Sequence, residues 1–494
     1  MTAMERIMSE ILQRARNYET AAISRDKEMK KALFHVCSPV GWMNDPNGFS
    51  KYNGEYHLFF QYHPYGVAFG PIHWGHVKTR DFLKWEYLPC ALAPDTEYDS
   101  QGCFSGSAIE WEGKHVLAYT GVKNTLDRNS VPVCRQTQCI AIGDGINYEK
   151  ISMNPVITSE QLPEGSSQED FRDPKIYSDG NVIYMVVGSR AADGSGQILM
   201  YKTKDFINWE FVSVLDQSNN ELGKMWECPD YFELNGKKVL IFSPQEVEAN
   251  KEFHNGNCTA GIVGYFDKET GKFQRENIQA IDYGLDYYAA QTLETEDGRR
   301  IMIGWLQSWD NHFYPKSFEW SGMMSIPREL RIENGRIYQE PVREIMEYYA
   351  NTTTFNEQYI RDEVSLDNIQ GRHNDLTFEL VDGEYKSFTL KVAVGNGKYS
   401  SVTYNRKEEE VEMSREFSGI PRDIIMTRKV KVSSADNKIK IRIIIDSYSL
   451  EIFINDGQAA MSMLIFTELK ANGITFQAEG TALANICCHN IEVR

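Results

Sequence analysis

Residues 78–86 read KTRDFLKWE and residues 202–210 read KTKDFINWE, so one nine-residue motif recurs at a spacing of 124 residues. An Asp-Pro dipeptide stands upstream of each copy, at Asp45 and at Asp173, and a short apolar stretch typical of a strand follows each dipeptide. Self-similarity at such a spacing is typical of folds in which one structural unit is repeated. The repeat is therefore expected to determine the architecture of this part of the chain.

Weaker copies of the same unit begin near residues 105, 227 and 289. Each copy joins two apolar segments through an Xaa-Gly turn, at 112–113, 235–236 and 297–298. Asn-Gly and Asp-Gly are strong hairpin signals because a tight hairpin turn needs positive φ at its central residues. The five starts are 60, 68, 54 and 62 residues apart, enough for one four-stranded sheet in each interval. The sequence thus predicts a five-bladed β-propeller over residues 33–341, with the opening residues of the five units gathered at one mouth of the central channel.

The pattern changes after the propeller. Residues 342–361 are interpreted as a linker with a short helix, and residues 362–494 alternate apolar and polar positions in short segments. This alternation, with an Asn-Asp-Gly turn at 455–457, predicts a separate antiparallel β-sandwich. Residues 1–32 have apolar positions near helical spacing, and we expect a short helix that packs on the propeller or on a partner subunit. The predicted fold class is all-β with one N-terminal helix.

Charge and composition narrow the function. The 52 Lys and Arg residues against 70 Asp and Glu residues give a formal net charge of −18. Nucleic acids and anionic lipid surfaces attract basic proteins, so this balance argues against nucleic-acid and membrane partners. Aromatic residues make up 12% of the chain, which favours strands and provides flat faces on which sugar rings can stack.

The cysteines and the N-terminus bear on the compartment. The nine cysteines are odd in number, scattered and free of any CxxC pair, which predicts reduced thiols. The sequence shows neither the apolar core of a signal peptide nor an apolar run of about 18 residues. We therefore expect a cytoplasmic protein, and the sequence leaves open whether it forms a homo-oligomer.

Three of the five units open on a carboxylate, namely Asp45, Asp173 and Glu227. Glycoside hydrolysis uses paired carboxyl groups, one to attack the sugar or activate water and one to protonate the departing oxygen. The plainer interpretation is that each acid caps a loop, since Asp-Pro is also a turn signal. Recurrence at corresponding positions of three units favours the catalytic interpretation.

Residues 42–48, WMNDPNG, resemble the signature of glycoside hydrolase family 32, the β-fructofuranosidases, which include invertases, sucrose-6-phosphate hydrolases and fructan exohydrolases. Further segments resemble the blocks of that family in the family's order, and the resemblance covers residues 33–494. These segments are 61–64, 72–76, 104–107, 171–174, 225–230, 282–284 and 327–330, with 446–447 and 451–457 in the sandwich.

The resemblance implies a retaining double displacement on a terminal β-D-fructofuranosyl unit of sucrose, sucrose 6-phosphate or a short fructooligosaccharide. It implies that Asp45 is the nucleophile, Glu227 the general acid and base, and Asp173 the stabiliser of the transition state. Retention requires the carboxyl groups of Asp45 and Glu227 to lie about 5 to 5.5 Å apart.

The resemblance also implies a set of fructosyl-binding residues, while Trp42 and Trp226 are expected to shape the pocket. The implied binding residues are Asn44, Gln61, Trp74, Ser105 and Arg172, the last of which is also expected to steady Asp173. No cofactor is implied. We expect no metal site either, so the clustered histidines are assigned structural or pocket roles; these are His57, His63, His73 and His76.

Several alternatives stay open at this point. The same site could serve a fructan exohydrolase or a fructosyltransferase, because segments 288–291 and 320–324 depart from the family pattern on the leaving-group side. A five-bladed arabinanase or xylosidase would use similar acids with inversion and a longer carboxyl separation. A non-catalytic carbohydrate-binding propeller is the third alternative, although such a module has no need of all three acids.

Overall fold

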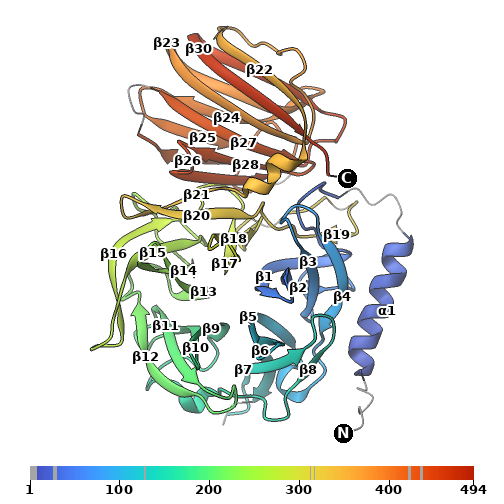
Figure 1. Ribbon diagram of the computed structural model, residues 1–494, viewed down its shortest axis with the longest axis vertical. Coiled ribbons are helices and arrows are strands. Elements are labelled where there is room, and N and C mark those ends of the chain that lie inside the picture. The colour runs from blue at the N-terminus through green and yellow to red at the C-terminus, as the bar shows by residue number, and fades with distance from the viewer. Residues whose placement is uncertain are drawn as a thin grey trace.

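The computed structural model of the protein describes residues 8–25, 31–126, 129–311, 313–315, 317–420, 424–433 and 438–493. Helix α1 (Glu10–Arg25) is followed by five β-sheets arranged around a central axis and then by a C-terminal pair of packed β-layers (Figure 1). The predicted all-β class, with a five-bladed propeller, a sandwich and one N-terminal helix, is therefore confirmed.

Each blade is an antiparallel four-stranded meander whose first strand lies nearest the axis. Blade 1 contains β1 (Gly41–Tyr52), β2 (Glu55–His63), β3 (His73–Thr79) and β4 (Glu86–Leu92). Blade 2 contains β5 (Gly102–Trp111), β6 (Lys114–Leu126), β7 (Pro132–Gly143) and β8 (Tyr148–Lys150). Blade 3 contains β9 (Phe171–Asp179), β10 (Val182–Arg190), β11 (Gly196–Thr203) and β12 (Glu210–Gln217).

Blade 4 contains β13 (Met225–Leu234), β14 (Lys237–Gln245), β15 (Ala260–Asp267) and β16 (Lys272–Ala280). Blade 5 contains β17 (Tyr288–Glu294), β18 (Arg300–Trp305), β20 (Arg328–Glu333) and β21 (Arg336–Pro341). The two-residue strand β19 (Trp320–Ser321) leaves the β18–β20 connection and pairs in parallel with β1. This pairing joins the last blade to the first and closes the ring.

The repeated motif builds the turn between the last two strands of blades 1 and 3. In the first copy the Thr79 hydroxyl donates to Asp81, whose carboxylate accepts the backbone N–H groups two and three residues further on. The Trp85 indole N–H donates to the carbonyl of Phe82, which has a positive φ of 63°. Residues 202–210 reproduce the same bonds. The sequence repeat is thus a repeat of hydrogen-bonding geometry.

Every inner strand is irregular where its unit was predicted to start. The strand pairings show β-bulges between 43 and 46, 104 and 106, 172 and 175, 227 and 230, and 288 and 291. Asp173, Cys228 and Ala289 have positive φ values of 69°, 48° and 56°. A bulge interrupts the alternation of side chains and redirects them, and such strained backbone is commonly found at functional sites. The bulges therefore turn side chains of the inner strands toward the channel mouth.

The sandwich is built on two long strands, β23 (Asn374–Gly395) and β30 (Gly473–Ile491), which pair antiparallel along most of their length. The remaining strands extend the layers on either side of this pair. They are β22 (Tyr349–Ile360), β24 (Lys398–Asn405), β25 (Glu410–Ser414), β26 (Thr427–Lys431), β27 (Ile439–Asp446), β28 (Ser449–Ile454) and β29 (Ala459–Leu464).

The predicted linker at 342–361 is where the structure differs from the sequence analysis. After a short 3-10 helix (Arg343–Tyr348), strand β22 pairs antiparallel with β30, so most of this segment belongs to the sandwich. β22 pairs only with β30, at the edge of its sheet, and most of its residues are exposed or half-buried. An edge strand of this kind lacks the apolar alternation by which strands are recognised in a sequence.

Helix α1 packs on the outer strand of blade 1 (Figure 1). The Arg16 guanidinium donates to the carbonyl of Cys90 in β4, and the buried Glu19 carboxylate accepts the N–H of the same residue. The N-terminal helix was expected to pack on the propeller or on a partner subunit, and α1 packs on the propeller. Residues 1–7 and 26–30 lie outside the described residues. Among the described helices, none has the length and apolar composition that crossing a membrane requires.

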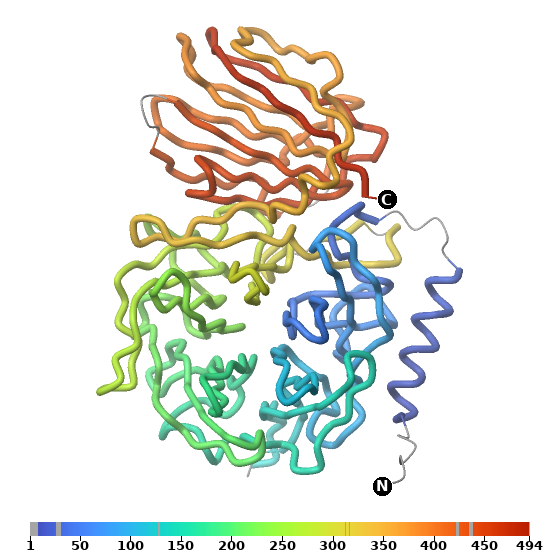
Figure 2. The backbone as a smooth tube through the Cα atoms, in the orientation of Figure 1, coloured from blue at the N-terminus to red at the C-terminus, as the bar shows by residue number. Residues whose placement is uncertain are grey.

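A buried charge network joins the propeller to the sandwich. His35, just before blade 1, contacts Asp446 at 2.7 Å through Nδ1 and Glu451 at 2.9 Å through Nε2. Arg328 donates to the other oxygen of Glu451 at 2.6 Å and to Asp282 at 3.0 Å. In Figure 2 the dark blue segment that precedes β1 lies at this boundary between the two domains. The family-like segments that contain these residues therefore meet at the domain interface rather than at the channel mouth.

Candidate active site

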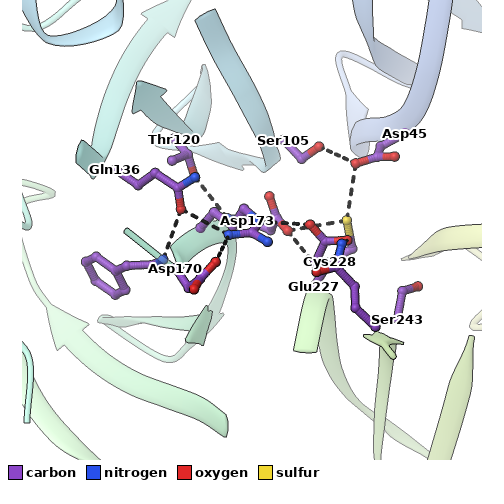
Figure 3. A network of polar contacts seen from close by, with 12 residues as sticks. Asp45, Ser105, Thr120, Gln136, Asp170, Asp173, Glu227, Cys228 and Ser243 are labelled. Carbon is purple, nitrogen blue, oxygen red and sulfur yellow. Dashed lines mark hydrogen bonds and ion pairs between the residues drawn. The ribbon is translucent and has the colours of Figure 1, made fainter. Parts of the chain in front are cut away.

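A cavity of about 970 Å³ opens at the mouth of the central channel. Asp45 on β1, Asp173 on β9 and Glu227 on β13 all line it, so the acids of blades 1, 3 and 4 converge there. Figure 3 shows the side chains of the three acids around one small volume, with Cys228 between them. The channel mouth thus brings together the three carboxyl groups singled out in the sequence.

Asp45 is almost inaccessible and accepts hydrogen bonds on both carboxylate oxygens. Ser105 Oγ donates to Oδ2 at 2.7 Å and Gln61 Nε2 donates to the same oxygen at 3.3 Å, while Asn44 Nδ2 donates to Oδ1 at 3.2 Å. Burial, followed by the negative charge of Glu227, raises the pKa of Asp45 to about 6. The carboxyl group is therefore ionised at neutral pH and held in a fixed orientation.

Asp173 is held through its backbone N–H and through its carboxylate. Its N–H donates to Thr120 Oγ1 at 2.9 Å, and its Oδ2 accepts the backbone N–H of Cys228 at 2.9 Å. Burial first, and then the charge of Glu227, raises the pKa of Asp173 to about 7. This group consequently titrates close to neutrality.

Cys228 places its thiol between two of the acids. Sγ lies 3.5 Å from Asp45 Oδ2 and 3.6 Å from Asp173 Oδ2 (Figure 3). Burial and the surrounding carboxylates raise the pKa of this thiol well above its ordinary value. The thiol therefore stays protonated and acts as a weak donor to the carboxylates, not as a nucleophile.

Glu227 is bound by three donors from three different strands. Arg172 Nε donates to Oε1 at 2.8 Å, while Tyr288 Oη and Gln245 Nε2 donate to Oε2 at 2.6 and 2.8 Å. The expected contact between Arg172 and Asp173 is not made, because the guanidinium is turned to Glu227 instead. Glu227 thus differs from Asp45 and Asp173 in accepting a hydrogen bond from a guanidinium.

Two of these donors were not predicted from the sequence. Tyr288 lies at the bulge that opens blade 5, so its position in the repeat could have revealed it. Gln245 ends β14 opposite Met225, a placement that becomes visible only when the hairpin is paired.

The predicted sugar-binding residues divide into two groups. Asn44, Gln61 and Ser105 surround Asp45, and Arg172 lines the cavity. Trp42 also lines it, and its indole N–H donates to Asn44 at 2.8 Å.

Two predicted tryptophans lie elsewhere. Trp74 is fully buried and its indole N–H donates to the carbonyl of Phe104. Trp226, expected to shape the pocket, is stacked on Phe242 in the core of blade 4 and does not line the cavity. The pairing is regular from Met225 to Glu227, so side chains alternate there and Trp226 faces away from its neighbour Glu227.

The histidine cluster belongs to blade 1. His57 Nδ1 and His76 Nε2 form a hydrogen bond of 2.9 Å, and His73 Nδ1 bonds the carbonyl of Pro71. The His63 ring lies over the β2–β3 connection, where Nδ1 bonds the carbonyl of Ala68. These imidazoles have protein partners and lie outside the group of three acids.

The walls of the cavity differ in character. One side is apolar and aromatic, formed by Val67, Phe69, Phe104, Trp309 and Phe313. The other side carries Ser167, Glu169, Asp170 and Arg190. Among the described lining residues the cations are Arg172 and Arg190, and both form ion pairs with Asp170, at 3.0 and 2.8 Å.

Comparison with known proteins places residues 35–341 and 344–493 in one family. The model of the glycosyl hydrolases family 32 N-terminal domain matches residues 35–341, and that of the family 32 C-terminal region matches residues 344–493. The sucrose-6-phosphate hydrolase of Zymomonas mobilis is 35% identical over 480 residues, which cover 91% of this chain and 90% of that protein. The raffinose invertase of Escherichia coli is 33% identical over 455 residues, covering 91% and 93%.

A solved structure gives the same result. The Bombyx mori GH32 β-fructofuranosidase BmSUC1, in a variant bound to sucrose, superposes with a TM-score of 0.84 at 31% identity. The match covers 97% of this chain and 98% of that one. This assignment decides against the arabinanase-type and non-catalytic alternatives. The chain belongs to glycosyl hydrolase family 32 and is a glycoside hydrolase.

Proposed function

We propose that this enzyme releases terminal β-D-fructofuranosyl residues from sucrose by a double displacement, with Asp45 as nucleophile and Glu227 as general acid and base. The observation that carries the proposal is the contrast between the two carboxyl groups. Asp45 is buried among neutral donors, whereas Glu227 lies under Arg172, Tyr288 and Gln245 in the same cavity. Two carboxyl groups in distinct environments are what a glycosidase needs for two distinct roles.

In the first step an Asp45 oxygen attacks the anomeric carbon of the fructosyl unit. The bond to the bridging oxygen breaks, and that oxygen takes a proton from Glu227 as glucose departs. In the second step Glu227 removes a proton from water, whose oxygen attacks the same carbon and releases Asp45. The pKa of Asp45, raised to about 6, is consistent with an ionised nucleophile at neutral pH.

Asp173 is assigned a supporting role at the same carbon. Its carboxylate faces the cavity, where it can accept hydrogen bonds from fructosyl hydroxyls and stabilise positive charge that develops on the ring. The weak thiol donor of Cys228 is shared between Asp173 and Asp45, which fixes the two acids relative to each other.

Two observations bear on the leaving group. The cavity lining carries five carboxylates, and its two described arginines are engaged with Asp170; this negative charge favours a neutral leaving group and hence sucrose. Relatives named as sucrose-6-phosphate hydrolases favour the phosphorylated sugar as a second candidate.

The test is a comparison of kcat/KM on sucrose, sucrose 6-phosphate and kestose, together with the variant Asp45→Asn. We expect sucrose to be the best substrate and the variant to lose at least about a thousandfold in kcat, because the nucleophile is gone. Asp367→Asn, the same change at an exposed site, is the matched control and should retain wild-type rates. Full activity of Asp45→Asn would disprove the assignment.

Methanol distinguishes the two stereochemical courses. A fructosyl-enzyme intermediate passes the sugar to methanol and gives methyl β-D-fructofuranoside, which NMR identifies. The α-anomer, or the absence of any methyl glycoside, would contradict the double displacement.

We also propose that the enzyme works in the cytoplasm. All nine cysteines are free thiols, seven of them buried, which supports a reducing compartment. Fractionation of the source cells, with activity assayed in each fraction, tests this location.

A further inference from the structure

A second cavity, of about 560 Å³, lies in the groove between the propeller and the sandwich. Its propeller wall is the β14–β15 connection, residues 249–254, together with Tyr283 and Arg336. Its sandwich wall is strand β26 with the residues that follow it, up to Ser433. It shares no lining residue with the cavity that holds the three acids.

Arg428, on β26, lines this cavity with no described acidic partner. Its Nε is buried and has no hydrogen-bond partner, and among the described residues no carboxylate lies within 4 Å of its guanidinium. The neighbouring cation on the same strand differs, because Lys429 forms ion pairs with Glu410 and Glu412 at 3.2 and 3.0 Å. A partly buried guanidinium without a directly bonded carboxylate is well suited to receive an anion.

His254 enters the same cavity from the propeller. Burial, and then the charge of Arg428, lowers the pKa of His254 to about 4, so the imidazole is neutral at neutral pH. The described part of the chain supplies no hydrogen-bond partner for this ring. A neutral imidazole still offers one N–H donor. Donors from both domains therefore line one cavity without being used.

The remaining charges of the cavity are largely paired with each other. Arg336 bonds Glu252, and Lys429 bonds Glu410. Asp282 is bound by Arg328 in the domain interface. Asp286 and Asp310, which act on Arg428 from a distance, are engaged by Arg415 and by Asn257. Lys431 pairs with Glu408 and Glu410 at 3.6 and 3.5 Å, so Arg428 and the exposed Lys251 are the cations left to attract a ligand.

We propose that this groove is a binding site for a phosphate group, carried by inorganic phosphate or by a hexose phosphate, with Arg428 and His254 as its ligands. The planar guanidinium can donate two parallel N–H bonds to phosphate oxygens, and the imidazole of the other domain can donate a third. A cavity of about 560 Å³ exceeds the needs of a phosphate ion and lies in the range typical of small-molecule sites. The site therefore has room for the sugar of a hexose phosphate as well.

The test is isothermal titration calorimetry of the full chain with inorganic phosphate and, separately, with glucose 6-phosphate. We expect saturable binding by the wild type and at least a tenfold higher Kd for Arg428→Gln and for His254→Leu, which removes the imidazole donor. Arg428→Lys, which keeps the charge but loses the planar fork, should have a Kd between those of the wild type and Arg428→Gln. Lys429→Gln, on the same strand, is the matched control and should change the Kd by less than twofold.

The two titrants separate the sources of the phosphate. A Kd at least tenfold lower for glucose 6-phosphate identifies the sugar phosphate as the ligand, and equal values identify free phosphate. No binding by the wild type, unchanged binding by Arg428→Gln, or equal weakening by Lys429→Gln would each overturn the proposal. Thermal unfolding of each variant establishes that it is folded, and sucrose hydrolysis by Arg428→Gln should match the wild type, so the outcome is independent of the catalytic assignment.

Discussion

Replacing His35 by glutamine should destabilise the protein in a way that depends on pH. The imidazolium lies fully buried between Asp446 and Glu451, whose hydrogen bonds and charges overcome the effect of burial and raise the pKa of His35 to about 9. Relative to the ordinary value of 6.5, and at about 1.4 kcal/mol for each pKa unit, this shift corresponds to about 3 kcal/mol of stability. Removing one partner of a buried ion pair generally costs about 3 to 5 kcal/mol, which is the same order.

The sign of the pH dependence follows from the direction of the shift. The pKa of His35 is higher in the folded state, so its contribution is complete below about pH 6.5 and is lost as the pH rises toward about 9. Asp446 behaves in the opposite way, because its pKa is lowered to about 2 and its contribution is lost only in acid. Asp173 also titrates in the neutral range, but it is common to both proteins. The difference between wild type and His35→Gln therefore reports His35 together with Asp446 and Glu451, whose pKa values His35 helps to lower.

Urea unfolding followed by tryptophan fluorescence at pH 6, 7.5 and 9.5 gives the free energies. The gap between wild type and His35→Gln should be about 3 kcal/mol larger at pH 6 than at pH 9.5. His489→Gln, at a half-buried position whose pKa is lowered by burial, is the control; the sign of its shift is opposite, so its gap should not be larger at pH 6 than at pH 9.5. An equal gap at all three pH values would refute the charged state assigned to His35.

Three further outcomes are expected. Because attack requires ionised Asp45, whose pKa is raised to about 6, kcat/KM on sucrose should fall about tenfold per pH unit below that value, and a profile flat to pH 4.5 would contradict this. Tyr288→Phe removes the 2.6 Å donor to Glu227 and should lower kcat/KM by about tenfold to a hundredfold without lowering Tm; wild-type kinetics would exclude a positioning role. In Gly106→Ala the new Cβ would lie 1.9 Å from a backbone carbonyl oxygen of β6, so the free energy of unfolding should fall by about 1 to 3 kcal/mol. Gly66→Ala, whose nearest contact would be 3.6 Å away, should unfold like the wild type.

The propeller could be predicted from the sequence because its signals are local. The Thr79–Asp81 bond and the indole bond of Trp85 are made within a few residues, so the motif that encodes them is visible as a repeat. Asn235 and Gly236 form a tight turn with positive φ values of 49° and 75°, as the dipeptide predicts. The convergence of the acids then follows from the equivalence of the units.

The details of the candidate site could not be predicted, since they depend on bulges and on contacts between blades. The bulge after Glu227 gives Cys228 a positive φ and places its thiol between Asp45 and Asp173, which no sequence spacing predicts. Arg172 lies one residue from Asp173 but 55 residues from Glu227. It bonds Glu227 because the fold brings the two side chains together. Gln245 and Tyr288 approach Glu227 from two other strands, so no sequence spacing connects them.

The binding of the N-terminal segment to the sandwich sets an order for assembly. The backbone N–H groups of residues 33–35 donate to the carboxylate of Asp446, and β1 is completed by the parallel strand β19. A ribosome must therefore synthesise more than four hundred further residues before the segment ahead of blade 1 meets its partner. The ring can close once β19 has been made, but the segment ahead of blade 1 is clamped only when the sandwich docks. A chain truncated before Asp446 would thus leave the N–H donors of residues 33–35 without their acceptor, so loss of the C-terminal part would destabilise the N-terminal segment.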